Sequence, residues 1–297
     1  MMAARELGYS PNTAARSLVV GRSSMVGLVI PDIENPFFPE ITKAFQESAA
    51  IAGLETIVMN TNYDAQRTRN MVDRLASLQV PGAAFLTSQV DPPVREALAK
   101  RGICGVYLEH DVTAERISNI AIDYSHGIAD AVRHLAELGH RRVGFISGPA
   151  HGSSARRRKS AFQENADAHG LETRVLDSDF TVQGGYFSCS RLLNGFAATA
   201  LMAANDLMAI GAMHFAYDRQ IRVPTDLSVI GFDDITFAQF TQPALTTVNV
   251  PRVEIGRLAF QALSALIADA QLGGKQYEVK TSLVLRQTTA PPPEGQI

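Results

Sequence analysis

Short apolar runs alternate with segments of helical periodicity along most of the chain. The apolar runs lie at residues 25–30, 56–59, 82–87, 103–108, 142–147, 198–203 and 227–232. Between them, for example at 41–52 and 128–138, apolar residues recur at the spacing of one helix face, and a glycine follows. This alternation predicts βαβ units and parallel sheets.

The distribution of the apolar runs predicts two lobes. About four runs precede residues 119–125 and about four follow them, which favours two similar doubly wound α/β lobes over one large sheet. A chain of 297 residues with 46% hydrophobic residues can bury two cores of this size. Residues 289–297 include three consecutive prolines, so we expect a disordered tail.

The first 22 residues have a different pattern. Residues 3–7 resemble the end of a helix that stops at Gly8, and Ser10-Pro11-Asn12 resembles a turn into a short helix at 13–18. A helix of one or two turns is marginally stable alone in water. We therefore expect this stretch to dock on another molecule.

Charge and cysteine content limit the function classes. The formal net charge of −3 argues against a uniformly basic nucleic-acid binder, so a DNA contact would need a local patch. No apolar run approaches the roughly 20 residues that span a bilayer, and no signal peptide is visible, which predicts a cytoplasmic protein without a membrane partner. We expect Cys104 and Cys189 to be inert buried thiols.

Asn35-Pro36-Phe37-Phe38 follows the first predicted strand. Asn suits a helix N-cap and Pro the first helical position, so these residues are explained in part as a helix start. Consecutive helix residues point about 100° apart, so we expect one of the two rings to face a cleft. Aromatic rings at the end of a strand suit stacking on a sugar or a base.

The basic run Arg156-Arg157-Arg158-Lys159 lies in the first turns of a predicted helix. Positive charge is unfavourable there because it opposes the helix macrodipole, although a solvated surface run is an equal alternative. Asp233, which ends the strand at 227–232, could compensate it, or could only cap a following helix. A carboxylate and a guanidinium together form a fork that suits neighbouring hydroxyl groups.

Asn205 and Asp206 follow another predicted strand. We expect Asp206 to cap the next helix and Asn205 to be either a turn residue or a ligand contact. Nucleotide-binding and catalytic motifs are missing from the sequence, and the histidines lack metal-ligand spacing. We therefore expect no enzyme activity, no cofactor and no metal.

Several segments, in this order and at compatible spacing, resemble the LacI/GalR family of transcriptional regulators over nearly the whole chain. They are Gly8-Tyr9-Ser10-Pro11-Asn12, Ala15-Arg16-Ser17-Leu18, Gly27-Leu28-Val29-Ile30-Pro31-Asp32, Asn35-Pro36-Phe37-Phe38, Gly139-His140-Arg141-Arg142-Val143-Gly144, Ala204-Asn205-Asp206, Val229-Ile230-Gly231-Phe232-Asp233-Asp234, Leu245-Thr246-Thr247-Val248 and Arg252-Val253-Glu254-Ile255-Gly256.

The resemblance implies a type I periplasmic-binding-protein-like core that closes on a small effector, a sugar or a nucleobase, and resets a DNA-binding headpiece in a homodimer. By the family pattern, residues 1–22 are the end of the headpiece and a hinge helix. Residues 23–124 with 250–278 form one lobe, and residues 125–249 with 279–288 form the other. The implied effector contacts are Asn35, Phe37, Phe38, Glu109, Arg156, Arg158, Asn205, Asp233 and Asn249.

The implied DNA contacts lie in the hinge helix, where Leu18 would wedge into the minor groove beside Asn12, Ala15 and Arg16. The family's first two helices have no counterpart in the sequence, so operator DNA is a partner only if the full headpiece is present. Glu109-His110 stands where sugar-binding relatives often carry Asp-Arg, which leaves the effector class open. The alternatives are a solute-binding protein of a transporter and an enzyme on the same scaffold.

Overall fold

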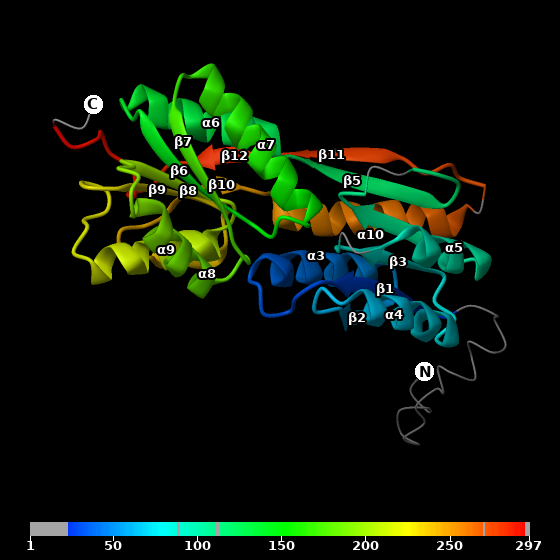
Figure 1. Ribbon diagram of the computed structural model, residues 1–297. Helices are drawn as coiled ribbons and strands as arrows, with labels where there is room; N and C mark the ends of the chain where they lie inside the picture. Colours follow the sequence, from blue (N-terminus) through cyan, green and yellow to red (C-terminus); the bar gives the residue numbers. More distant parts are fainter. Residues whose placement is uncertain (1–22, 88–89, 111–112, 270, 295–297) are drawn as a thin grey trace. The chain divides into compact units, whose positions relative to one another are not determined.

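A computed structural model describes residues 23–87, 90–110, 113–269 and 271–294 (Figure 1). The chain divides into two compact units. The first contains the chain up to Ala121 together with Arg252–Tyr277, and the second contains Ile122–Pro251 and the chain from Glu278 onward. Each unit has a six-stranded sheet with helices on both faces. The predicted pair of doubly wound α/β lobes is therefore confirmed.

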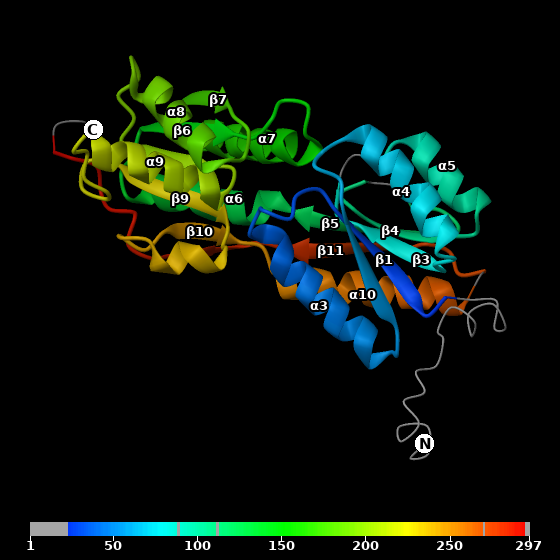
Figure 2. The same ribbon diagram turned by 90° about the horizontal axis from the view of Figure 1, so that it is seen from below.

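The sheet of the first unit has the strand order β11-β5-β4-β3-β1-β2. The pairs from β5 through β4, β3 and β1 to β2 are parallel. Helices α3 and α10 pack together on one face of this sheet, and α4 and α5 pack together on the other (Figure 2). The strands are β1 (Met25–Ile30), β2 (Glu55–Asn60), β3 (Gly82–Phe85), β4 (Cys104–Leu108), β5 (Ile117–Asp123) and β11 (Gln276–Lys280), and the helices are α3 (Phe37–Ile51), α4 (Ala65–Ser77), α5 (Pro92–Lys100) and α10 (Arg252–Ala268).

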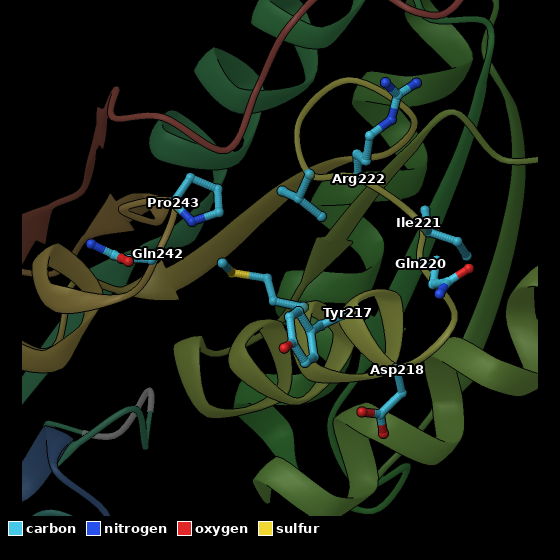
Figure 3. Close-up of a pocket in the computed structure, with 9 residues that line it drawn as sticks. Tyr217, Asp218, Gln220, Ile221, Arg222, Gln242 and Pro243 are labelled. Carbon is cyan, nitrogen blue, oxygen red and sulfur yellow. The ribbon is translucent and has the colours of Figure 1, made fainter.

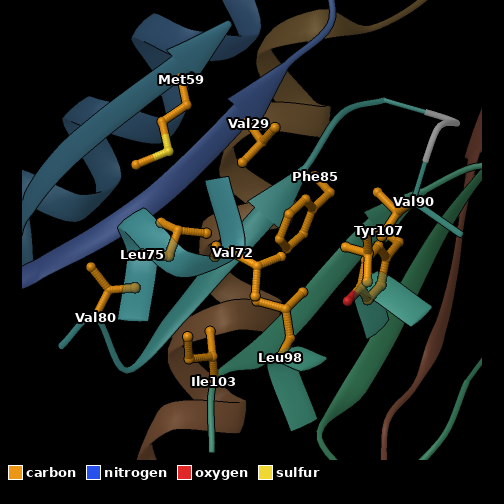
Figure 4. Close-up of a cluster of buried hydrophobic side chains, with 12 residues drawn as sticks. Val29, Met59, Val72, Leu75, Val80, Phe85, Val90, Leu98, Ile103 and Tyr107 are labelled. Atoms are coloured by element: carbon orange, nitrogen blue, oxygen red, sulfur yellow. The ribbon is translucent and has the colours of Figure 1, made fainter. Parts of the chain in front are cut away.

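A hydrophobic cluster fills the space between this sheet and helices α4 and α5 (Figure 4). Val72 and Leu75 lie one helical turn apart on α4, and Leu98 faces them from α5. Phe85 and Tyr107 stack in adjacent strands with ring centroids 5.0 Å apart. Burial of each such side chain contributes roughly 1.5–3 kcal/mol to the stability of the folded state. The cluster therefore fixes the strands of this sheet against α4 and α5.

The sheet of the second unit has the strand order β12-β10-β9-β8-β6-β7. It is parallel except for β12, which is antiparallel to β10. Helices α6 and α7 pack against each other, as do α8 and α9. The strands are β6 (Arg142–Ser147), β7 (Glu172–Asp177), β8 (Ala200–Ala203), β9 (Ser228–Asp233), β10 (Thr246–Asn249) and β12 (Ser282–Val284), and the helices are α6 (Tyr124–Glu137), α7 (Ser153–Ala168), α8 (Val182–Leu193), α9 (Asp206–Asp218) and the 3-10 helix η1 (Thr236–Phe240).

Residues 119–125, about which the predicted strands divide, form the end of β5 and the start of α6, and the two units divide between Ala121 and Ile122. One local expectation needs correction. The tail expected to be disordered from residue 289 is held at its first two residues. The Thr289 hydroxyl lies 3.0 Å from Nε2 of His134, and the Ala290 carbonyl oxygen lies 3.0 Å from Nε2 of His140. These hydrogen bonds order the chain to at least Ala290.

Both cysteines are free and buried, as expected, and burial raises the pKa of Cys189 to about 12. None of the helices that the structure describes has the length and apolar character needed to span a membrane. The hinge-helix residues Asn12, Ala15, Arg16 and Leu18 lie outside the described residues.

Candidate functional site

Arg158 lies at the centre of a buried cluster in the second unit. Its side chain arises from the second turn of α7 and is only 7% exposed. The guanidinium carbon lies 4.2 Å from the centroid of the Phe232 ring and 4.7 Å from that of Tyr124. A third ring, Phe180, has its centroid at 6.0 Å. These are cation–π distances, so the aromatic faces partly replace the water that the buried cation has lost.

Asp233 supplies the opposite charge. Its Oδ1 lies 3.4 Å from Nη2 of Arg158, and the Asp233 residue is 4% exposed. Nη1 of Arg158 also donates a hydrogen bond to the carbonyl oxygen of Ala204, at the end of β8. The hypothesis that Asp233 compensates a charge of the basic run is thus confirmed for Arg158.

The backbone at Asp233 departs from strand geometry. The φ angles of Asp233 and Asp234 are 109° and 55°, in the region where residues other than glycine are strained. In a regular strand, Phe232 and Asp233 would point to opposite faces of the sheet. Here both contact the Arg158 guanidinium. The strained turn at the end of β9 therefore brings the aromatic ring and the carboxylate to one cation.

Asn249 and Asn205 lie at the ends of strands near this cluster. Asn249 ends β10 and is half-buried, and its backbone is paired in register with that of Asp233. Asn205 is 2% exposed, and its Oδ1 accepts a hydrogen bond from Met208 N–H at 2.9 Å. Its Nδ2 donates to the carbonyl oxygen of Phe180 at 2.9 Å. Asn205 is therefore the N-cap of α9.

Asp206, expected to be that cap, has a different position. The residue is completely buried, and its carboxyl accepts hydrogen bonds from Ile235 N–H at 2.8 Å and from the Thr247 hydroxyl at 2.5 Å. Burial and, next, the negative charge of Asp233 raise the pKa of Asp206 well above its usual value. Both residues suit an N-cap, and the direction of the chain at the end of β8 decides between them.

The predicted residues of the first unit follow β1 and β4. Asn35 Oδ1 accepts a hydrogen bond from Phe37 N–H at 3.0 Å. The N-cap of α3 is nevertheless Pro36 and the first helical residue is Phe37, so the helix starts one residue later than expected. The Phe37 and Phe38 rings meet edge to face with centroids 5.1 Å apart. Each residue is 6% exposed, and the expectation that one of the two rings faces a cleft stays a prediction.

Glu109 follows β4 and is also buried, with 7% exposure and a φ of 67°. The next residue, His110, has Nε2 3.0 Å from the carbonyl oxygen of Thr87, so this nitrogen carries a proton and donates it. Burial lowers the pKa of His110 and thereby favours the neutral ring. The departure at Glu109-His110 thus places a carboxyl group and a neutral imidazole at the end of one strand.

Arg156 does not join the Arg158 cluster. Its Nη1 donates to the carbonyl oxygen of His151 at 2.7 Å, and its side chain is exposed. It lines a separate cavity of about 310 Å³ with Lys159 and Asp177, whose Nζ and Oδ1 atoms are 3.2 Å apart. Residues two apart on a helix point about 200° apart, which explains the different surroundings of Arg156 and Arg158.

A larger cavity, of about 810 Å³, lies elsewhere in the second unit (Figure 3). Gln242 and Pro243 face Ile221 and Arg222 across it, and Tyr217 lies on its border. It is lined by none of the residues predicted as effector contacts. Within the described ranges, no group of three or more His, Cys, Asp or Glu side chains could hold a metal ion.

Comparisons with known proteins agree with the two-unit architecture. A model of the periplasmic binding protein-like domain matches residues 132–289. A ribose operon repressor from Halalkalibacterium halodurans is 32% identical over 290 residues, covering 97% of this chain and 86% of the repressor. The chain belongs to the LacI/GalR family of transcriptional regulators.

Solved structures of LacI/GalR regulators have the same fold. A regulator from Enterococcus faecium with bound ribose is 26% identical, with a TM-score of 0.82 over 90% of this chain and 99% of that one. A dimeric Lac repressor is 25% identical, with a TM-score of 0.82 and the same coverage. These relatives are regulators and not enzymes, and they do not favour the transporter alternative.

Sequence reasoning missed three residues around Arg158, namely Tyr124, Phe180 and Phe232. Phe232 had a signal, because it directly precedes Asp233 at the end of a predicted strand. Tyr124 directly follows β5 and begins α6, and Phe180 lies between β7 and α8. Neither strand was predicted, so the sequence did not place these rings at the carboxyl end of a sheet.

Proposed function

We propose that this LacI/GalR regulator binds a small polyhydroxylated effector, a sugar or sugar derivative, and that the effector controls binding of a homodimer to operator DNA. The buried pair of Arg158 and Asp233, surrounded by aromatic rings at the end of a parallel sheet, is the observation that carries this proposal. We place the protein in the cytoplasm, where operator DNA is found.

The chemistry of the cluster supports a neutral polar ligand. A carboxylate accepts hydrogen bonds from hydroxyl groups, a guanidinium donates to hydroxyl oxygens, and ring faces pack against C–H groups. Arg158 and Asp233 neutralise each other, so neither a strong anion nor a strong cation is needed as ligand. The ring pair of Phe37 and Phe38 supports a purine base as the second candidate, since bases stack on aromatic rings.

The proposed mechanism is a shift between open and closed forms of the two units. Asn35, Phe37, Phe38 and Glu109 of the first unit would contribute contacts that the second unit alone does not supply. An effector shifts this equilibrium only by its difference in affinity for the two forms. In a homodimer, closure would change the spacing of the two hinge helices, whose residues Asn12, Ala15, Arg16 and Leu18 we propose as minor-groove contacts.

Titration calorimetry with D-ribose, other monosaccharides, disaccharides and purine bases tests the effector class. We expect one sugar class to bind, and we expect Asp233→Asn to weaken that binding at least tenfold, the loss of one charge-assisted hydrogen bond. Asp226→Asn is the matched control, because this carboxylate pairs with Arg222 on the surface. Binding of the same sugar with unchanged affinity by Asp233→Asn would refute the site.

A further inference from the structure

Asp206 links three elements of the second unit. It is the first residue of α9, and its two carboxyl oxygens bind the Ile235 amide that follows β9 and the Thr247 hydroxyl of β10. Strand β9 leaves room for it at Gly231, where a Cβ atom would lie only 2.1 Å from Asp206 Oδ1. The sequence-based expectation of a helix cap does not account for a carboxyl in this position.

The Ile235 amide that Asp206 binds ends the strained turn at Asp233 and Asp234. Asp206 holds this turn from one side, and Arg286 holds it from the other through an ion pair of 2.6 Å with Asp234. The backbone of the turn sets the direction of the Asp233 side chain toward Arg158. A change at Asp206 would therefore reach Asp233 through the backbone of residues 233–235.

We propose that Asp206 is a positioning residue for the effector site, which holds the Asp233–Asp234 turn through Ile235 N–H and does so as a neutral carboxylic acid. The Thr247 hydroxyl donates to an ionised Asp206. In the neutral form this bond would be reversed, with the acid proton on Oδ1 donated to the Thr247 oxygen, while the other carboxyl oxygen still accepts from Ile235 N–H. The inference deepens the proposed function and rests on it for the role in effector binding.

The charges around Asp206 favour its neutral form. Asp233 at the end of β9 and Asp234 directly after it act on Asp206 through their negative charge. Each of them is paired, Asp233 with Arg158 of α7 and Asp234 with Arg286 of the last segment. Thr247, its partner on β10, is uncharged. Among the residues that the structure describes, no lysine, arginine or histidine forms an ion pair with Asp206. A third carboxylate would thus be a buried negative charge beside two others.

The contact with Thr247 is compatible with a proton on Asp206. A hydroxyl group can donate or accept, so Thr247 remains a hydrogen-bond partner when Asp206 is a carboxylic acid that donates to it. The raised pKa of Asp206, caused first by burial and then by Asp233, agrees with this assignment. An asparagine at the same position would preserve one acceptor and one donor, whereas alanine would remove both.

The first experiment needs no effector. The carboxyl ¹³C shift of Asp206 is followed against pH, and amide hydrogen exchange at Ile235 is measured in wild type, Asp206→Asn and Asp206→Ala. We expect a protonated carboxyl at pH 7, near wild-type protection of Ile235 in Asp206→Asn, and a loss of about tenfold or more in Asp206→Ala. Asp218→Asn, an exposed carboxylate on the same helix, is the control and should change nothing.

An ionised Asp206 at pH 7, or equal loss of Ile235 amide protection in both Asp206 variants, would overturn the proposal that neutral Asp206 holds the turn. If Asp206→Ala does not fold, Thr247→Val replaces it, because this change removes only the hydroxyl partner. The titration of Asp206 in Thr247→Val still decides the outcome.

The second experiment tests positioning by measuring affinity for D-ribose, or for the sugar that binds in the screen above, as a function of pH. We expect wild-type affinity to fall as rising pH ionises Asp206, and Asp206→Asn to bind as tightly as neutral wild type with a flat profile in that range. A merely structural role would leave both profiles parallel. If wild type binds no sugar or purine, the proposed function fails. The exchange and titration results still decide whether neutral Asp206 holds the turn.

Discussion

Two arginines two positions apart on α7 show how one residue gains a role that its neighbour lacks. Arg156 is exposed and donates to loop carbonyl groups, whereas Arg158 is buried between two rings and beside Asp233. A buried ion pair adds little over well-packed apolar residues, but loss of one partner leaves an uncompensated charge. The stability of the site therefore depends on the pair as a unit.

We expect Arg158→Ala to lower the free energy of unfolding by about 3–5 kcal/mol, because Asp233 then remains buried without its cation. Arg156→Ala, the matched change on the exposed side of the same helix, should stay within about 0.5 kcal/mol of wild type. Urea unfolding measures both. The double variant Arg158→Ala with Asp233→Asn should recover part of the loss, and no recovery would show that charge is not the cause.

At the scale of elements, side chains of other strands and helices hold the last segment of the chain. Val229 N–H donates to the Thr288 carbonyl oxygen at 2.8 Å, the Thr288 hydroxyl donates back to the Val229 carbonyl oxygen at 2.6 Å, and the Ala290 amide donates to the Ser228 hydroxyl at 3.0 Å. His140, which follows α6, lies 2.8 Å from the Thr199 hydroxyl through Nδ1 and 3.0 Å from the Ala290 carbonyl through Nε2. The carbonyl requires a donor, so Nε2 carries a proton. Burial lowers the pKa of His140 and thereby favours the neutral ring, in which Nδ1 accepts from the Thr199 hydroxyl.

This arrangement predicts a loss of stability in acid. Burial lowers the pKa of His140 from 6.5 to about 4, so the unfolded chain takes up a proton first as pH falls. The contribution of neutral His140 to the free energy of unfolding is fully present above pH 6.5. It is lost as the pH falls from 6.5 through 4, by about 3 kcal/mol in total. In urea unfolding at several pH values, His140→Gln should lose this part of the pH dependence. The exposed His169→Gln should retain it, and identical slopes for all three proteins would contradict the assignment.

At the scale of the whole molecule, three crossings of the chain join the two units. They follow Ala121, Pro251 and Tyr277, so each unit contains segments from both halves of the sequence. In the proposed mechanism, these three segments would keep the units joined while an effector shifts the equilibrium between the open and closed forms. The proposed regulation requires a second copy as well, because a two-fold symmetric protein reads two operator half-sites.

We expect the protein to be a homodimer in solution. Sedimentation velocity should show a species of twice the 32.1 kDa chain mass, with or without sugar. Asp233→Asn should sediment identically, because the change lies in the buried cluster of one chain. A single-chain mass at all micromolar concentrations would contradict the prediction.

The sequence alone determined the fold class and most of the strands. The apolar runs that become β1, β6 and β9 are buried on both faces, so their pattern is continuous and easily recognised. Strand β7 was missed because it is an edge strand, Glu172–Asp177, with polar residues among its few apolar ones. The candidate residues came from motif resemblance, and their ligand contacts remain predictions.

Only the tertiary structure decided which of two neighbouring polar residues caps a helix and which is buried in the site. From sequence, Asn205 and Asp206 are both suitable helix caps, and Arg156 and Arg158 are both cations at a helix start. The direction of α9 buries Asp206 under β9 and β10, and the rotation of α7 turns Arg158 toward Asp233. Local pattern specifies residue type and period, whereas burial and pairing depend on elements distant in the chain, so only the folded structure could assign these roles.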